Sequence, residues 1–147
     1  MSTPILPEPG IRTSGWRGIR ARAAVAVAIP LSRLSPGRVQ RVLGFVVRGG
    51  TRPTPADVLR WRGAVVGVSR RCAGEGCLPR SVAVMLLARS HGFAPVWKTG
   101  FRPSPFIGHA WVEVDGVAVG EPDIVGTFLT TLQVSPAYRD ERHEADR

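Results

Sequence analysis

Cysteine is scarce in this sequence: Cys72 and Cys77 are the only two among 147 residues. Two cysteines this close together cannot form the framework of a secreted, disulfide-rich domain. Long hydrophobic runs are missing too, since the apolar stretch at residues 23–31 contains Pro30 and is about half as long as a membrane span. The first ten residues are interrupted by prolines and lack the basic start of a signal peptide. We therefore expect a cytoplasmic protein without a membrane span.

Lysine is almost absent as well, because Lys98 is the only one and nearly all positive charge comes from arginine. The 20 basic residues against 11 acidic ones give a net charge of +9. Guanidinium groups suit carboxylate-bearing peptides, phosphates and acidic protein surfaces, although a solvated basic surface has the same composition. A hydrophobic content of 44% in a chain of this length favours one globular domain.

Helices are predicted for most of the first two thirds of the chain, over residues 16–29, 36–48, 55–74 and 77–90. The second starts with Ser35 as N-cap and Pro36 as the first helical residue, and it ends at two glycines. The third starts with an approximate capping box formed by Thr54 and Asp57.

Strand signals follow in the last third. Residues 94–100 have strand character, and residues 102–105 predict a rigid loop. The strongest signal is residues 109–114, the turn Asp115-Gly116 and residues 117–119, which together are typical of a β-hairpin. Helices first and strands second predict an α+β fold.

Cys77 stands at the head of the fourth predicted helix, with Pro79 in the first turn, where proline is tolerated. The unpaired N–H groups and the dipole of a helix N-terminus favour a thiolate over a thiol. Residues 82–88 are apolar on every face, which predicts a helix packed from all sides. An isolated cysteine is commonly a buried, inert thiol, but this placement is also the one by which a cysteine hydrolase aims its nucleophile.

A thiolate nucleophile needs a histidine base, which in turn needs an orienting acid or amide. His143 lies in a charged tail, and His91 lies at the far end of the helix that Cys77 begins, about 20 Å away at 1.5 Å per residue. His109 opens the best-predicted strand, which could bring its imidazole to the sulfur. His109 is therefore the candidate base.

Which acid orients His109 depends on the register of the hairpin. With a two-residue turn, Glu121 would lie opposite Ala110, on the wrong face of the strand for His109. With one extra residue as a bulge, Glu121 would lie opposite Trp111, and Asp123 would lie opposite His109. The sequence does not fix the register, so both acids remain candidates.

Two motifs in this chain resemble a known family: Cys77-Leu78-Pro79-Arg80-Ser81, and Gly108-His109-Ala110-Trp111-Val112-Glu113-Val114-Asp115-Gly116. At this separation they are similar to the transglutaminase-like leader peptidase of lasso-peptide biosynthesis, in the split form whose leader-recognition domain is a separate protein. The resemblance covers about residues 20–135. It implies a papain-like α+β fold and a triad with Cys77 as nucleophile, His109 as base and Glu121 as acid, where relatives commonly carry Asp.

The resemblance also implies an activity and partners. The activity is removal of the leader from a ribosomally made precursor peptide, before a separate cyclase closes the macrolactam ring. The partners are this precursor, a separate leader-recognition protein and the cyclase, and the scheme needs no metal ion or other cofactor. The expected parts are a tail at 1–15, a helical region at 16–53 for docking the partner or leader, a transglutaminase-like core at 54–135 and a charged tail at 136–147. The Cys77 N–H is the expected oxyanion donor.

Three other functions fit parts of the sequence. The same triad could transfer the acyl group to an amine, because nothing in the sequence separates water from an amine as second nucleophile. The net charge permits a nucleic-acid-binding module, but Trp61 and Trp111 lie in apolar patterns and no nucleic-acid motif is present. A scaffold that only presents the precursor would not need an intact Cys77 and His109.

Cys72 has a separate interpretation. It precedes a glycine-rich loop at the end of a helix, where the dipole disfavours a thiolate, so we expect a packed or partly exposed thiol. A zinc site built from Cys72, Cys77, His91 and His109 would have suitable ligands but no recognised ligand spacing.

Overall fold

The structure is a computed structural model that describes residues 12 and 14–138. The predicted tails at 1–15 and 136–147, including His143, lie mostly outside the described residues. Within the described part the helices are α1 (Gly15–Leu31), α2 (Pro36–Val46), α3 (Pro55–Val68), α4 (Arg70–Ala73), α5 (Cys77–Ser90) and the 3-10 helix η1 (Asp123–Thr127). The strands are β1 (Val96–Pro103), β2 (Phe106–Val114), β3 (Val117–Ala118) and β4 (Leu129–Val134).

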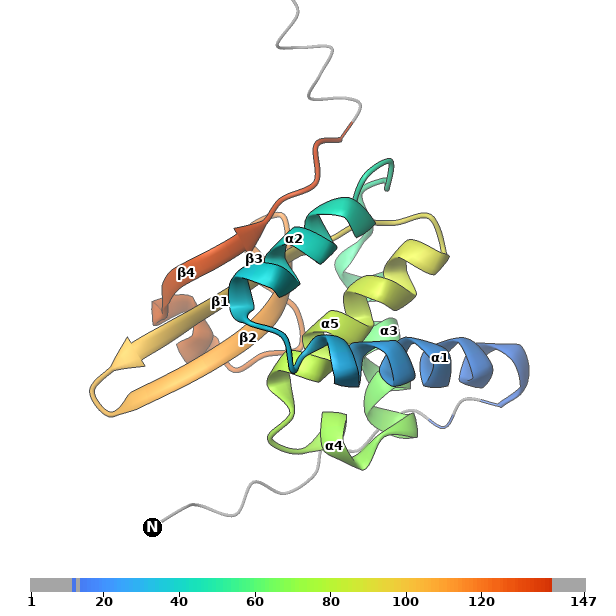
Figure 1. Ribbon diagram of the computed structural model, residues 1–147, viewed down its shortest axis with the longest axis horizontal. Coiled ribbons are helices and arrows are strands. Elements are labelled where there is room, and N and C mark those ends of the chain that lie inside the picture. The colour runs from blue at the N-terminus through green and yellow to red at the C-terminus, as the bar shows by residue number, and fades with distance from the viewer. Residues whose placement is uncertain (1–11, 13, 139–147) are drawn as a thin grey trace, which may run out of the picture.

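The helical N-terminal half is followed by one antiparallel sheet of four strands, in the order β3-β2-β1-β4. Helix α5 occupies the centre, where it contacts α1 and α3 on one side and β2 on the other, while α2 packs on β4 (Figure 1). The prediction of an α+β fold with this order of helices and strands is confirmed.

The hydrophobic core surrounds α5. Its side chains from Val82 to Met85 and the following Leu87 and Ala88 are all buried, which confirms that this helix is packed from all sides. The core continues into α1 through Ala21 and Ala28, and into the sheet through Trp97. Because helices from the N-terminal half and strands from the C-terminal half share this core, the position of Cys77 is fixed from both sides.

The third predicted helix starts as expected but ends early. Thr54 and Asp57 form the complete capping box at the start of α3. At Ser69 the backbone is extended, and the Ser69 hydroxyl accepts a hydrogen bond from the Cys72 N–H, which starts the separate helix α4. The prediction of one continuous helix over residues 55–74 is therefore wrong, because a capping side chain divides it.

The facing ends of β1 and β2 extend further than predicted, whereas β1 starts two residues later, β3 ends one residue earlier, and β4 was not predicted. β1 and β2 pair up to Pro103 and Phe106, so the rigid loop predicted at 102–105 shrinks to two residues. Pro103 lies beyond the part of β1 that pairs with β4, which ends at Phe101, so one side of β1 is an edge there and tolerates a residue without an N–H. The Asp115-Gly116 turn is confirmed as a two-residue turn, with φ of 51° and 78° as a primed hairpin turn requires.

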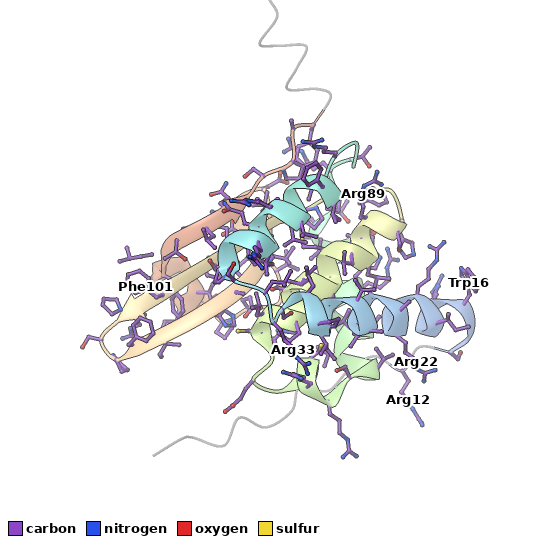
Figure 2. The ribbon with its side chains drawn as sticks, in the orientation of Figure 1. Arg12, Trp16, Arg22, Arg33, Arg89 and Phe101 are labelled. Carbon is purple, nitrogen blue, oxygen red and sulfur yellow. The ribbon has the colours of Figure 1, made fainter. Side chains whose placement is uncertain are left out.

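The surface carries arginine side chains on several separate elements. Figure 2 shows Arg22 on α1, Arg33 after its end and Arg89 near the end of α5, with Phe101 on the β1–β2 hairpin. Among the described residues, no helix combines the length and the apolar character needed to cross a membrane.

Candidate active site

Cys77 begins α5 because Gly76 turns the chain sharply in front of it. Gly76 has φ −78° and ψ 53°, the conformation of an inverse γ-turn, and the Cys77 N–H donates to the Glu75 carbonyl at 2.9 Å. A β-carbon at position 76 would collide with the Arg71 carbonyl oxygen, so this position requires glycine. The Cys77 N–H, the expected oxyanion donor, is donated within this turn, so it would have to leave the Glu75 carbonyl to reach an oxyanion.

β2 brings His109 to the sulfur. A side-chain hydrogen bond joins the Cys77 thiol and the His109 ring, and the backbone N–H of Ala110 also donates to the sulfur. Both side chains are half-buried, so they are held by packing while one side stays open.

Glu121 contacts the other side of the His109 ring. Its Oε2 lies 2.7 Å from His109 Nε2, and the Glu121 side chain is only 5% exposed. Because an ionised carboxylate only accepts hydrogen bonds, Nε2 carries the proton in this contact, which leaves Nδ1 for the sulfur. Cys77, His109 and Glu121 thus form one connected row.

The hairpin register alone does not predict the contact between Glu121 and His109. Val114 pairs with Val117, which is the two-residue register that put Glu121 opposite Ala110. The ladder ends at β3, however, and Gly120 with φ 70° turns the chain out of the sheet, so strand parity no longer governs residue 121. Asp123, the other candidate acid, is exposed at the start of η1.

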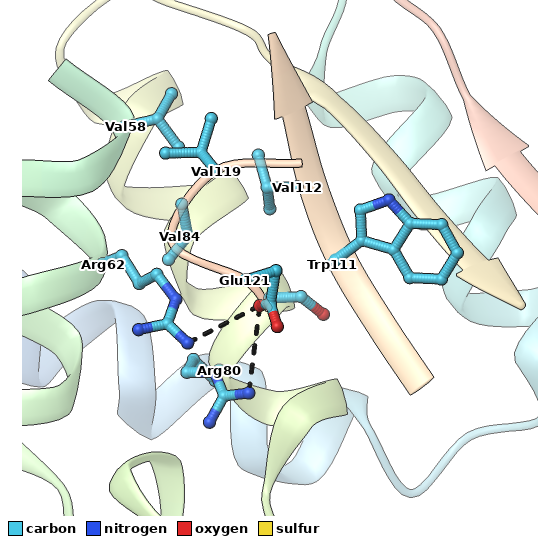
Figure 3. Close-up of a pocket in the computed structure, with 9 residues that line it drawn as sticks. Val58, Arg62, Arg80, Val84, Trp111, Val112, Val119 and Glu121 are labelled. Carbon is cyan, nitrogen blue, oxygen red and sulfur yellow. Dashed lines mark ion pairs between the residues drawn. The ribbon is translucent and has the colours of Figure 1, made fainter. Parts of the chain in front are cut away.

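Two buried arginines flank Glu121 on the side away from His109. Arg62 Nη2 lies 3.6 Å and Arg80 Nη2 lies 4.0 Å from Glu121 Oε1 (Figure 3). Arg80 also donates to the carbonyls of Cys72 and Gly74, which fixes the loop directly before Cys77. The carboxylate is therefore surrounded by positive charge.

Aromatic rings cover the histidine. Trp111 stacks on His109 with ring centroids 6.1 Å apart and planes 15° apart, and Phe128 meets both rings edge-on. Trp111 Nε1 donates to Glu113, so its ring plane is fixed. A β-carbon at Gly100, which pairs with His109 across the sheet, would lie 2.8 Å from the Trp111 ring.

These contacts favour an ion pair between sulfur and imidazole. Burial raises the pKa of the Cys77 thiol, but the hydrogen bond from His109, the Ala110 N–H and the positive charges of His109 and Arg80 outweigh burial, so this pKa lies below its ordinary value. Burial lowers the pKa of His109, whereas its hydrogen bonds to Cys77 and Glu121 and their negative charges raise it to about 9. Both shifts favour the thiolate–imidazolium pair over the neutral thiol and imidazole.

The two hollows near the site differ in size. Cys77 lies on an open pocket of about 490 Å³, lined by Arg70, Arg71, Glu75 and the first turn of α5. The hollow behind Glu121 in Figure 3 has a volume of only about 10 Å³ and includes Arg62 and Arg80 in its lining. A polypeptide can reach only the first, so the second is part of the support for the site.

The remaining candidates lie apart from this row. Cys72 is fully buried, and burial raises the pKa of its thiol. His91 caps the C-terminus of α5, at the other end of the helix from Cys77, with its Nδ1 3.0 Å from the Leu87 carbonyl oxygen. In the part of the chain that the structure describes, no group of three or more His, Cys, Asp or Glu side chains could hold a metal ion.

Sequence reasoning missed Arg62 and the stacking role of Trp111. Both left a signal. Arg62 follows Val58 by four residues and precedes Val65 by three, so it falls on the buried stripe of α3, where an arginine needs a charged partner. Trp111 shares the face of β2 with His109, as the alternation along a strand requires.

A comparison with protein families agrees with this arrangement. The model of the transglutaminase-like superfamily matches residues 21–133, which include Cys77, His109 and Glu121. Neither the curated proteins nor the solved structures gave a match to this chain. Enzymes of this superfamily are generally cysteine proteases or acyltransferases. This chain belongs to the transglutaminase-like superfamily.

Proposed function

We propose that this protein is a cysteine peptidase that removes the leader from a lasso-peptide precursor, together with a separate leader-recognition protein. The observation that carries the enzymatic part is the connected row of Cys77, His109 and Glu121 beside an open pocket. The leader-peptidase part is supported by the two motifs around Cys77 and His109 and by their separation.

The first half of the reaction forms a thioester. The Cys77 thiolate attacks the carbonyl carbon of the scissile amide, so that a carbon–sulfur bond forms and the carbonyl oxygen becomes an oxyanion. The His109 imidazolium then gives its Nδ1 proton to the amide nitrogen, the carbon–nitrogen bond breaks, and the peptide with the new amino terminus leaves. Glu121 keeps the ring oriented during this transfer.

The second half consumes water. Neutral His109 takes a proton from a water molecule, whose oxygen attacks the thioester carbon. The carbon–sulfur bond breaks, the leader leaves with a new carboxyl terminus, and Cys77 returns as thiolate beside the imidazolium. The proton that His109 takes from water replaces the one that His109 gave to the leaving amine.

The surroundings of Cys77 favour a peptide with acidic side chains near the scissile bond. Arg70 and Arg71 are exposed at the pocket and outnumber Glu75, the acidic residue of its lining. Guanidinium groups form charge-assisted hydrogen bonds with carboxylates. The macrolactam-forming cyclase would act on the released product, because ring closure needs the amino terminus that cleavage creates.

The test is mass spectrometry of a candidate precursor incubated with the protein, with and without the candidate leader-binding partner. We expect one cleavage at the junction of leader and core with wild type, and an intact precursor with Cys77→Ala. The partner alone is the control. A precursor that stays intact under all conditions, or that Cys77→Ala cleaves equally well, would overturn the proposal.

A labelled primary amine in the same reaction separates hydrolysis from acyl transfer. A peptidase releases the leader as a free acid, even with amine present. If the amine appears on the leader instead, the protein is an acyltransferase that uses the same three residues.

A further inference from the structure

Arg62 is a buried arginine that the peptidase mechanism does not use directly. Its side chain reaches from α3 to the active site and is only 10% exposed, with Nη2 3.6 Å from Glu121 Oε1. A buried guanidinium is costly unless an opposite charge compensates it. Glu121 Oε1 supplies such an opposite charge.

The two carboxylate oxygens of Glu121 face different partners. Oε2 contacts His109 at 2.7 Å, while Oε1 faces Arg62 and, at 4.0 Å, Arg80 (Figure 3). A carboxylate held at one oxygen alone can rotate away from its partner. Attraction of the second oxygen toward the arginines restricts this rotation and keeps Oε2 directed at the imidazole.

The main chain before Glu121 also rests on Arg62. A β-carbon at Gly120 would lie 2.7 Å from Arg62 Cδ and 3.0 Å from its Nε, which shows how closely the backbone approaches this side chain. Gly120 is also the residue whose positive φ turns the chain out of the sheet. The aliphatic part of Arg62 thus supports the turn, and its guanidinium faces the carboxylate.

Arg62 can be separated from the neighbouring Arg80. Arg80 donates to the Cys72 and Gly74 carbonyls, so its replacement would disturb the loop before Cys77. Arg62 lies on α3, outside that loop, and its Nη2 lies near Glu121 Oε1. We propose that Arg62 is a positioning residue, whose guanidinium holds the Glu121 carboxylate in the orientation that supports His109; the role in catalysis rests on the proposed function.

The test measures the rate at which iodoacetamide alkylates Cys77 as a function of pH, because this reaction needs no peptide substrate. We compare wild type with Arg62→Met, which keeps most of the aliphatic stem, and with Arg62→Lys, which keeps the charge. Arg60→Met is the matched control, since Arg60 lies on the same helix with its side chain 63% exposed. Peptide mapping identifies the alkylated cysteine, and thermal unfolding verifies that each variant folds.

With Arg62→Met we expect the alkylation rate at pH 7 to fall about tenfold and its pH midpoint to move upward, because a less oriented His109 holds the thiolate less well. Arg62→Lys should lie between this variant and wild type, and Arg60→Met should match wild type. If Arg62→Met does not fold, Arg62→Lys carries the same comparison. An unchanged pH profile in a folded Arg62 variant would overturn the proposal, because it would mean a purely structural role.

A double-mutant cycle shows whether Arg62 acts through Glu121. In a Glu121→Gln background, we expect the Arg62 substitution to change the alkylation profile little. An equal shift in both backgrounds would overturn the proposal. Cleavage of the precursor is measured separately, so an absence of cleavage by wild type would reject the proposed function while the alkylation data still decide the role of Arg62.

Discussion

Glu121 and His109 are joined by a 2.7 Å contact although they do not face each other in the sheet. The ladder between β2 and β3 ends before Glu121, and the turn at Gly120 brings the carboxylate back to the ring. The acid is therefore placed by a loop and by the side chains around it. Its second carboxylate oxygen faces Arg62 and Arg80, which both lie outside the sheet.

The activity should depend on pH in a bell-shaped manner. The active ion pair requires a deprotonated Cys77, and the lowered pKa of its thiol permits this below the pH range of an ordinary thiol. It also requires a protonated His109, and the pKa of about 9 keeps this ring protonated up to that pH. Glu121→Gln removes a negative charge that raises the pKa of His109, so the basic limb should move to lower pH. The profile of kcat/KM for both proteins is the measurement. A basic limb that stays in place would contradict the role of Glu121.

The raised pKa of His109 should also make the stability of the protein depend on pH. The pKa of His109 is raised from 6.5 to about 9 by folding, so its protonation stabilises the native state fully below about pH 6.5, and this contribution is lost as the pH rises through 9. In Glu121→Gln this loss should occur at lower pH.

Gly100→Ala should destabilise the protein and impair the site. The new β-carbon would lie 2.5 Å from the Leu129 carbonyl oxygen and 2.8 Å from the Trp111 ring that stacks on His109. We expect a loss of about 1–3 kcal/mol in the free energy of unfolding, measured by denaturant titration. Gly108→Ala is the control, because a β-carbon there meets nothing within 4 Å. Equal losses in the two variants would mean that close packing is not the cause.

Thr54→Ala should cost about 1 kcal/mol of stability, because the Thr54 hydroxyl accepts the Asp57 N–H at the start of α3. Ser35 occupies the same position before α2 but makes no capping hydrogen bond with its side chain. We therefore expect Ser35→Ala to have an effect of less than about 0.5 kcal/mol. The comparison of melting temperatures checks this, and a larger loss in Ser35→Ala would contradict it.

Arg71→Glu should change the preference among peptide substrates. Arg71 lines the open pocket at Cys77, so a reversed charge should disfavour an acidic residue near the scissile bond and favour a basic one. For an exposed charge we expect about a 2- to 5-fold change in the ratio of kcat/KM values for matched Glu and Lys peptides. Arg22→Glu on α1 is the control for net charge. The expectation fails if both variants change the ratio equally.

The fold could be predicted from local signals because most of its boundaries are set locally. The capping box at Thr54, the glycine before Cys77 and the Asp115-Gly116 turn each determine one boundary through neighbouring residues. The division at Ser69 was missed because a serine inside an amphipathic pattern signals a cap only when the chain actually bends there. The length of the β1–β2 hairpin was missed because it depends on pairing between the two strands.

The site was only partly predictable for a related reason. Cys77 and His109 could be proposed from their positions at the starts of a helix and a strand. The contact of Glu121 could not be derived from strand parity, since parity applies only within a ladder and Gly120 ends it. The place of Arg62 on the buried stripe of α3 indicates its burial, but its approach to Gly120 depends on packing between α3 and the segment after β3, which no local pattern encodes.

The most direct test of the Cys77–His109 ion pair is the alkylation of Cys77 as a function of pH in wild type and in His109→Ala. Cys72 serves as an internal control, because it is fully buried and its thiol pKa is raised. We predict that wild type is modified at Cys77 alone and stays reactive well below pH 9, and that His109→Ala reacts only as the pH approaches the range of an ordinary thiol. Identical profiles for the two proteins would contradict the ion pair on which the proposed function depends.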